Sequence, residues 1–76
     1  MNNARRMRID ALKQKIESLC EEVETLRDEE QEALDNIPDS LRDSERGELS
    51  QSSIDAMESA ISDLEGAVNS LEEAAA

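Results

Sequence analysis

The chain has 76 residues, a formal net charge of −12, and neither histidine nor any aromatic residue. Its length allows one domain at most and buries too small a fraction of the surface for comfortable stability alone, so a partner or further copies are expected. The excess of acids repels nucleic acid and anionic membranes, and the absence of histidine excludes the usual catalytic sets of nucleophile, base and orienting residue.

The first predicted element is a helix over about residues 5–37. Apolar residues recur from Ile9 in alternating steps of three and four, which defines a heptad repeat with seam positions a and d. Position a holds Ile9, Ile16, Val23, Glu30 and Ile37, and position d holds Leu12, Leu19, Leu26 and Ala33. Glu30 interrupts the apolar seam, so we expect the packing to loosen there.

This helix carries an acidic face. Ten acids lie between residues 17 and 39, one for every roughly 3.3 Å of helix, which is close to the ~3.4 Å between phosphates of one DNA strand. A rod of this charge density suits a basic, nucleic-acid-binding protein, and the alternative is a solvated face that only keeps the protein soluble. The residues of the acidic face are Glu21, Glu22, Glu24, Asp28, Glu29, Glu32 and Asp35.

Cys20 is the only cysteine and lies at position e, beside the seam. A single thiol forms no disulfide within the chain, which suits a reducing compartment. We interpret it as a small apolar residue at the edge of the core, because the surrounding glutamates disfavour the thiolate that a redox role needs. The sequence has no calcium-binding loop and no Glu-x-x-His pair, so neither a metal nor a cofactor is predicted.

A turn is predicted over residues 38–50. Pro38 disfavours a helical conformation at the residue before it, which ends the first helix near Ile37. The connection is longer than the roughly two to eight residues usual in helical bundles. This surplus indicates a structured turn, in which Leu41 covers the end of the core.

The second predicted helix spans about residues 51–74 and repeats the heptad. Ser52 and Asp55 form a capping box at its start, although Ser44 could cap an earlier turn that runs through Gly47. A row of alanines beside the seam makes its apolar stripe wider than one partner helix needs. The predicted oligomer interface is Ile54, Met57, Ala60, Ile61, Leu64, Ala67, Val68 and Leu71, with Ala74 continuing the alanine row.

The flanking charges favour an antiparallel hairpin over a parallel dimer of the first helix, in which one flanking pair attracts and another repels. A single hairpin register aligns Lys13 with Glu72, Cys20 with Glu65 and Arg27 with Glu58. We therefore predict an all-α, coiled-coil-like antiparallel helical hairpin. Because two helices cannot enclose a core, two hairpins are expected to pair into a four-helix bundle.

The chain reads "NIPDSLRDSERGE" and then "IDAMESAISDLEGAVNSLEEA" between residues 35 and 74. This resembles a pattern in small, acidic, uncharacterised helical proteins of bacteria and their phages, with a Pro-x-Ser-Leu turn and a Ser-Glu-Arg step before an acidic amphipathic helix. The matching residues are Pro38, Ser40, Leu41, Ser44, Glu45 and Arg46. The resemblance implies a phage or mobile-element source and favours an inhibitor of host machinery, and it implies no catalytic residue.

Together these features predict a non-enzymatic protein-binding module. The preferred hypothesis is a small homodimeric inhibitor or adaptor whose acidic face engages a basic protein by nucleic-acid mimicry, without binding nucleic acid or membrane itself. The alternative is a structural homo-oligomerisation module with a merely solubilising acidic face. A cytoplasmic location is expected, since the sequence has no apolar run typical of a membrane span or a secretory signal.

Overall fold

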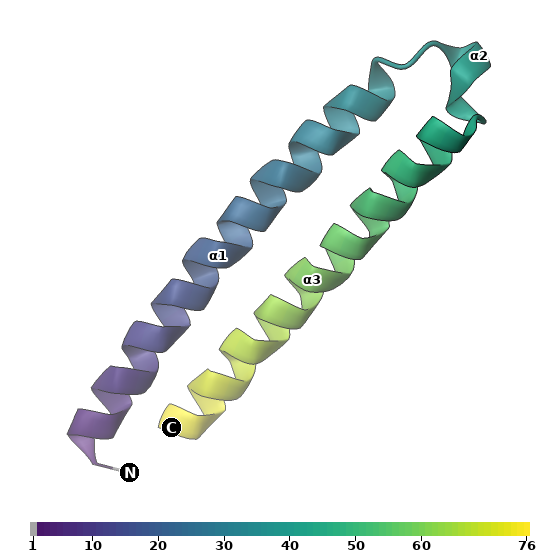
Figure 1. The fold of residues 1–76 in the computed structure, drawn as a ribbon. Helices are drawn as coiled ribbons and strands as arrows, with labels where there is room; N and C mark the ends of the chain where they lie inside the picture. Colours follow the sequence, from purple (N-terminus) through teal and green to yellow (C-terminus); the bar gives the residue numbers. More distant parts are fainter. Residues whose placement is uncertain (1) are drawn as a thin grey trace.

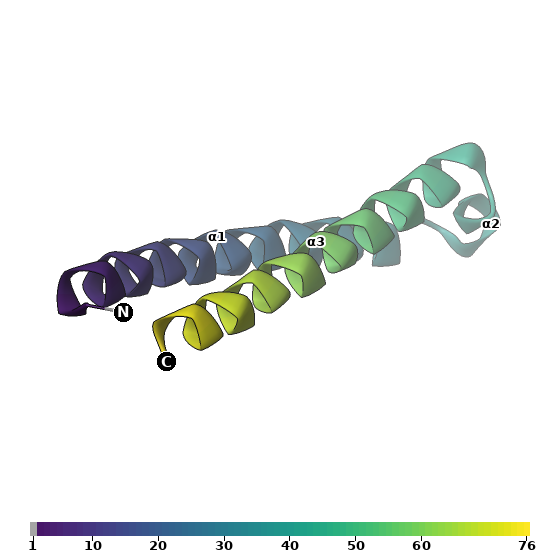
Figure 2. The ribbon, with the colours of Figure 1, turned by 90° about the horizontal axis from the view of Figure 1, so that it is seen from below.

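The computed structural model describes residues 2–76 and consists of two long helices joined by a short one (Figure 1). Helix α1 spans Asn3–Asp35, α2 spans Asp39–Arg42 and α3 spans Glu45–Ala75. Helices α1 and α3 run antiparallel and lie side by side in two perpendicular views (Figure 1, Figure 2), in a rod of 59 × 14 × 12 Å. The prediction of an all-α antiparallel hairpin is confirmed.

Helix α1 is bounded by an asparagine at each end. The Asn2 side chain accepts a hydrogen bond from the backbone N–H of Arg5 at 2.8 Å, which satisfies one of the free donors of the first turn. At the other end the Asn36 N–H donates to Glu32 O at 3.1 Å, and Pro38 follows two residues later. The helix lies about two residues nearer the N-terminus than the predicted 5–37.

Helix α2 occupies part of the predicted turn. Its single turn is closed by a hydrogen bond from the N–H of Leu41 to Pro38 O at 2.8 Å. The prediction that Leu41 covers the end of the core is wrong, because α2 holds this side chain on the outside of the tip, 52% exposed. The connection is therefore structured, but it adds no apolar cover to the hairpin.

Helix α3 begins at Glu45, earlier than the predicted start near residue 51, and the predicted turn of 38–50 is correspondingly too long. Ser44 is its extended N-cap, with the Ser44 hydroxyl donating back to Leu41 O. Acids at Glu45 and Glu48 in the first turn complement the helix dipole. Glycine in a helix costs about 1 kcal/mol, but Gly47 is buried on the side facing α1, so tertiary packing offsets that cost.

Packing between the long helices differs from the predicted seam on one of them. On α3 the most buried residues are Ile54 and Ile61, 1% and 6% exposed, both at position a as expected. On α1 they are Cys20 and Leu34, which occupy position e. Helix α1 therefore turns its a and e positions toward α3, instead of a and d.

The leucines at position d of α1 lie outside this packing. Leu12, Leu19 and Leu26 are 51%, 53% and 56% exposed, and Ala33 in the same row is exposed too. The heptad residues of α1 thus divide between a row packed on α3 and a row facing solvent. Within residues 2–76, neither long helix contains an apolar segment of the length that a bilayer requires.

Candidate protein-interaction surfaces

The register of the hairpin is set by contacts between the e positions of its two helices. The Nζ atom of Lys13 lies 3.5 Å from Glu72 Oε1, and Cys20 lies beside Glu65, both as predicted. Arg27, predicted to face Glu58, forms its ion pair with Asp28 on its own helix, at 3.1 Å. The two rows of e residues therefore meet along one side of the hairpin.

A leucine face lies along the opposite side. On a heptad wheel, d and e lie on opposite sides of a, so contact between the e rows places both d rows on the other side of the hairpin. The leucine face consists of Leu12, Leu19 and Leu26 from α1 and the half-buried Met57, Leu64 and Leu71 from α3. The alanine row of α3, at position g, borders it.

The predicted oligomer interface is divided by this arrangement. Ile54 and Ile61 belong to the contact between α1 and α3 within one chain, so they are not accessible to a second copy. The other predicted interface residues are half-buried, namely Met57, Ala60, Leu64, Ala67, Val68 and Leu71. Sequence reasoning missed the α1 leucines as surface residues, because it assigned them to the seam with α3.

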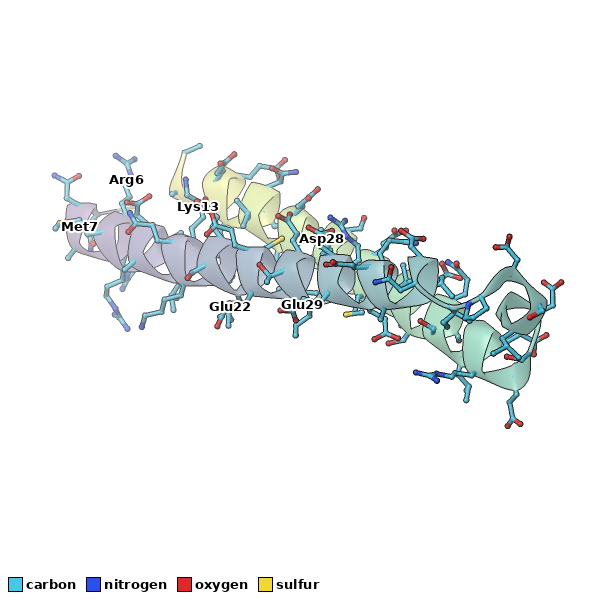
Figure 3. All side chains as sticks on the ribbon, turned by 90° about the horizontal axis from the view of Figure 1, so that it is seen from above. Arg6, Met7, Lys13, Glu22, Asp28 and Glu29 are labelled. Carbon is cyan, nitrogen blue, oxygen red and sulfur yellow. The ribbon has the colours of Figure 1, made fainter. Side chains whose placement is uncertain are left out.

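The acidic face lies on the outer half of α1. Six of its seven residues are exposed, and Glu24 is half-buried beside Cys20. Figure 3 shows Lys13 on the edge of α1 next to α3, and Glu22 and Glu29 on the opposite edge. Glu22 and Glu29, at position g, adjoin the leucine face, while the other five residues point away from it.

Cys20 sits in an acidic hollow of about 450 Å³ on the side where the e rows meet. Its Sγ lies 3.8 Å from Glu24 Oε1 and 3.9 Å from the backbone oxygen of Ile61. The Cys20 sulfur and one carboxylate oxygen each from Glu24 and Glu65 lie within 4.8 Å of one another, and such atoms are potential metal ligands. Burial, followed by the nearby charge of Glu24, raises the pKa of the Cys20 thiol. A protonated thiol is a poor metal ligand and a poor nucleophile, which agrees with the interpretation of Cys20 as a packing residue.

The raised pKa predicts a loss of stability in alkaline solution. The unfolded chain loses the thiol proton near the ordinary pKa of 9.0, and the folded chain holds it to higher pH. The free energy of unfolding should therefore fall as pH rises above 9, through the folded-state pKa. Cys20→Ser removes this component, so urea unfolding followed by circular dichroism at pH 8, 9 and 10 should show a smaller decline. Equal slopes for the two proteins would contradict the assignment.

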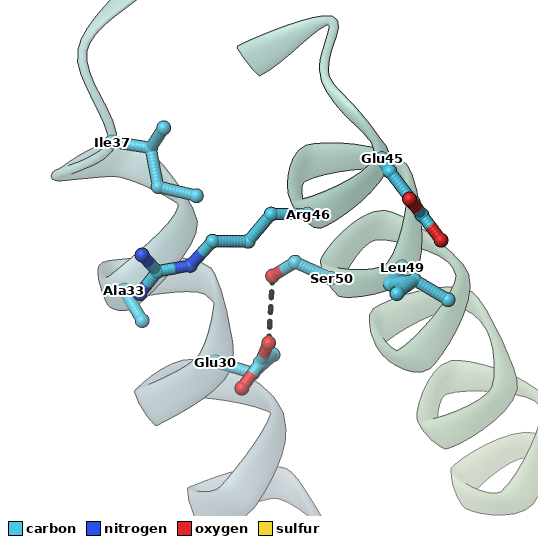
Figure 4. A pocket seen from close by; sticks show the side chains of 7 residues that line it. All are labelled: Glu30, Ala33, Ile37, Glu45, Arg46, Leu49 and Ser50. Carbon is cyan, nitrogen blue, oxygen red and sulfur yellow. Dashed lines mark hydrogen bonds between the residues drawn. The ribbon is translucent and has the colours of Figure 1, made fainter. Parts of the chain in front are cut away.

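Glu30, the acid in the apolar seam, is matched by a serine across the hairpin. The Ser50 hydroxyl donates to Glu30 Oε1 at 2.6 Å, and this bond joins α1 to α3 beside the tip (Figure 4). A hollow of about 510 Å³ opens around it, lined also by Ala33, Ile37 and Leu49. Figure 4 shows Arg46 extending from α3 across this hollow toward α1. The seam acid is therefore accommodated by a hydrogen bond, and the residues around it, Leu34, Gly47 and Ile54, are buried, so the expected loosening of the packing is not seen.

Ser50→Ala should destabilise the hairpin by about 1–2 kcal/mol, because it leaves a half-buried carboxylate without its donor. Glu30→Leu should be neutral or stabilising, since it restores the apolar seam. The exposed Ser52, on the same helix, gives the control variant Ser52→Ala, which reports the gain in helix propensity alone. The measurement is urea unfolding by circular dichroism, and equal effects of the two serine variants would refute the role of the bond.

Comparison of the chain with protein families, curated proteins and solved structures found no match.

Proposed function

We propose that this chain is a non-enzymatic protein-binding module that joins a second copy through its leucine face and binds a basic protein through its acidic face. The observation that carries the proposal is the separation of these two surfaces on one rigid hairpin. Apolar side chains occupy one side, and five of the seven acids point away from that side. Five of the seven acids therefore remain available while the leucine face is occupied.

The leucine face supports the pairing of hairpins into a four-helix bundle. Leu12, Leu19 and Leu26 each leave about half of their surface in water, at regular seven-residue intervals. Contiguous exposed apolar rows of this kind mark interaction sites in soluble proteins. The alanine row next to Leu64 permits close approach of a further helix, as bundle packing requires.

The acidic face supports a basic partner. Its carboxylates lie along a straight helix at the axial density of phosphates on a nucleic-acid strand. A basic groove built for DNA or RNA is complementary to such a rod. We therefore assign the protein to the class of small inhibitors or adaptors that act in the host cytoplasm, of phage or mobile-element origin, which occupy a nucleic-acid site by mimicry.

The test neutralises part of the acidic face without altering its shape. Glu21→Gln, Asp28→Asn, Glu32→Gln and Asp35→Asn remove four charges from exposed positions outside the border of the leucine face. Binding to basic proteins captured from a bacterial lysate should be lost, while the circular dichroism spectrum is retained. The wild-type complex should dissociate in high salt and in the presence of competing double-stranded DNA.

A matched control changes the net charge equally on the other helix. The exposed α3 residues provide it as Asp55→Asn, Glu58→Gln, Asp63→Asn and Glu73→Gln. Capture should survive in this variant if the α1 acids form the binding surface. Equal loss in both variants indicates bulk charge alone, and unchanged capture in the α1 variant rules the proposal out.

A structural homo-oligomerisation module is the second candidate, favoured by the half-exposed leucines at three successive d positions. In that case the acids only keep the protein soluble, and the function of the protein is self-association. This candidate gains support if the α1 and α3 charge variants both assemble normally and no basic protein is captured by the wild type.

A further inference from the structure

We infer that two copies of the hairpin pair tip-to-tail, so that the α2 tip of each copy lies beside the chain termini of the other. In this dimer the two α1 helices run antiparallel to each other, and a twofold axis passes beside Leu19 and Ala67. This inference rests on the proposed dimer and specifies its geometry. Two arrangements bring the leucine faces together in an all-antiparallel bundle. In one the two α2 tips lie at opposite ends of the bundle, and in the other they lie at the same end.

The charges that border the leucine face favour opposite ends. Position g of α1 holds Arg8, Lys15, Glu22 and Glu29, two bases followed by two acids along one edge. A twofold axis midway along α1 places Arg8 opposite Glu29 of the second copy, and Lys15 opposite Glu22. Symmetry doubles these contacts, so the dimer gains four attractive pairs and no repulsive pair along this edge.

The same axis also centres the α3 helices on their small residues. The register of the hairpin, with Lys13 beside Glu72 and Cys20 beside Glu65, sets Leu19 level with the residues next to Ala67. The alanine row is centred there, so Ala67 meets its own copy and Ala60 meets Ala74. Small side chains on both helices permit a short interaxial distance. A single twofold axis thus brings the leucine faces together, pairs opposite charges along the edge and places the two alanine rows in contact.

Placing the two α2 tips at the same end of the bundle removes both the charge pairs between the α1 helices and the contact between the alanine rows. Each α1 then lies beside the α3 of the second copy at equal height, so its charged edge faces the uncharged alanine row at position g of that helix. The charged edge then gains no attractive pair. Charge complementarity therefore distinguishes the two arrangements, although their apolar contacts are similar.

The N-terminal end of α1 gives independent support. Level with Asp10, α3 ends at Ala75, so the first residues of α1 extend beyond the partner helix within the chain (Figure 1). There Arg5, Arg8, Ile9 and Leu12 line a shallow, largely apolar hollow of about 190 Å³. In the tip-to-tail dimer this hollow receives the acidic end of the second α1, with Leu26 and Glu29 on its contacting edge.

Two experiments test the arrangement. The first attaches spin labels at the tip of the full chain through Ser40→Cys in a Cys20→Ala background and measures the distance between labels by pulsed electron resonance. Because α1 continues for 16 residues from Leu19 to Asp35 in each copy, the expected distance between the labels, which lie beyond these helix ends, is roughly 48 Å or more. Tips at one end would instead place the labels within about 20 Å, two helix diameters.

The second experiment reverses the charged edge. Arg8→Glu with Lys15→Glu should weaken dimerisation at least tenfold, and adding Glu22→Lys with Glu29→Lys should restore it. The pair Arg6→Glu and Arg46→Glu makes the same charge change outside the edge, and should leave dimerisation unchanged. The dissociation constant is measured by sedimentation equilibrium at low salt.

Each outcome decides one question. A long label distance together with rescue by the second charge reversal supports the tip-to-tail dimer. A dimer with a short label distance, or one indifferent to the edge charges, overturns this geometry but leaves the proposed pairing intact. A single-chain mass for the wild type at high micromolar concentration overturns both, and leaves the acidic face to be judged by its own variants.

Discussion

Replacing Leu12, Leu19 and Leu26 together by glutamine is expected to convert the proposed dimer into single hairpins. Each leucine is about half exposed in the single chain, so its remaining surface contributes about 1 kcal/mol on burial. Six leucines per dimer then sum to roughly 6 kcal/mol, and dimerisation should weaken at least a hundredfold. Glutamine keeps a high helix propensity, so the helical circular dichroism spectrum should persist. Mass measured by light scattering across a concentration series reports the change.

The tip supplies the control for this triple variant. Leu41 and Leu49 are similarly exposed, 52% and 65%, but lie outside the leucine face. Leu41→Gln with Leu49→Gln therefore removes exposed apolar surface without touching the proposed dimer contact, and the mass should remain that of two chains. A dimer that survives the triple variant, or dissociates equally in the control, would show that another surface joins the copies.

Ile54→Ala is the single substitution expected to cost most stability. Ile54 is 1% exposed and sits at a seam position of α3, in a core only one layer thick. Truncating a buried isoleucine to alanine costs about 2–5 kcal/mol. A small domain has only about 5–15 kcal/mol in total, so the urea midpoint should fall sharply, as followed by far-ultraviolet circular dichroism.

Leu49→Ala is the matched comparison for Ile54→Ala. It truncates a large apolar residue on the same helix, but at a position 65% exposed. Its effect should stay within about 0.5 kcal/mol, as for most surface substitutions. If the two variants lose similar stability, burial between α1 and α3 is not the main source of the folding free energy.

Much of the fold follows from local rules that act within a few residues. The heptad spacing identifies both long helices, and Pro38 and Asn36 account for the end of α1. The register is predictable as well, because opposite charges at Lys13 and Glu72 select one alignment of the two helices. These predictions hold because spacing and charge are properties of the sequence itself.

The rotation of α1 about its axis was not predictable from the same pattern. Its apolar residues form a stripe wide enough for two partners, and Leu34 and Leu26 lie on either side of the a row. Spacing alone does not say which side faces α3. In the structure Cys20 and Leu34 are covered and Leu26 is not, so two of the seven acids, Glu22 and Glu29, come to border an apolar surface.

The earlier start of α3 and the bond between Ser50 and Glu30 have a related cause. Both depend on contacts between segments that are distant in sequence, whereas helix propensity and capping signals are local. Ser52 and Asp55 offered a plausible cap, but the helix continues upstream through Gly47 because burial against α1 offsets the intrinsic cost of glycine. No local signal in the chain marks Ser50 as the partner of a seam acid.

The uneven burial along the rod implies that the two helices separate progressively, from the chain termini toward the tip. The buried residues lie in the middle and toward the tip, at Cys20, Leu34, Gly47, Ser50, Ile54 and Ile61. The bond from Glu30 to Ser50 closes a loop of 20 residues, whereas contact between Lys13 and Glu72 closes a far longer one at a greater entropic cost. Pairing therefore starts at the tip and fraying starts at the termini, so amide hydrogens near Ile54 should exchange last and those near Lys13 and Glu72 first.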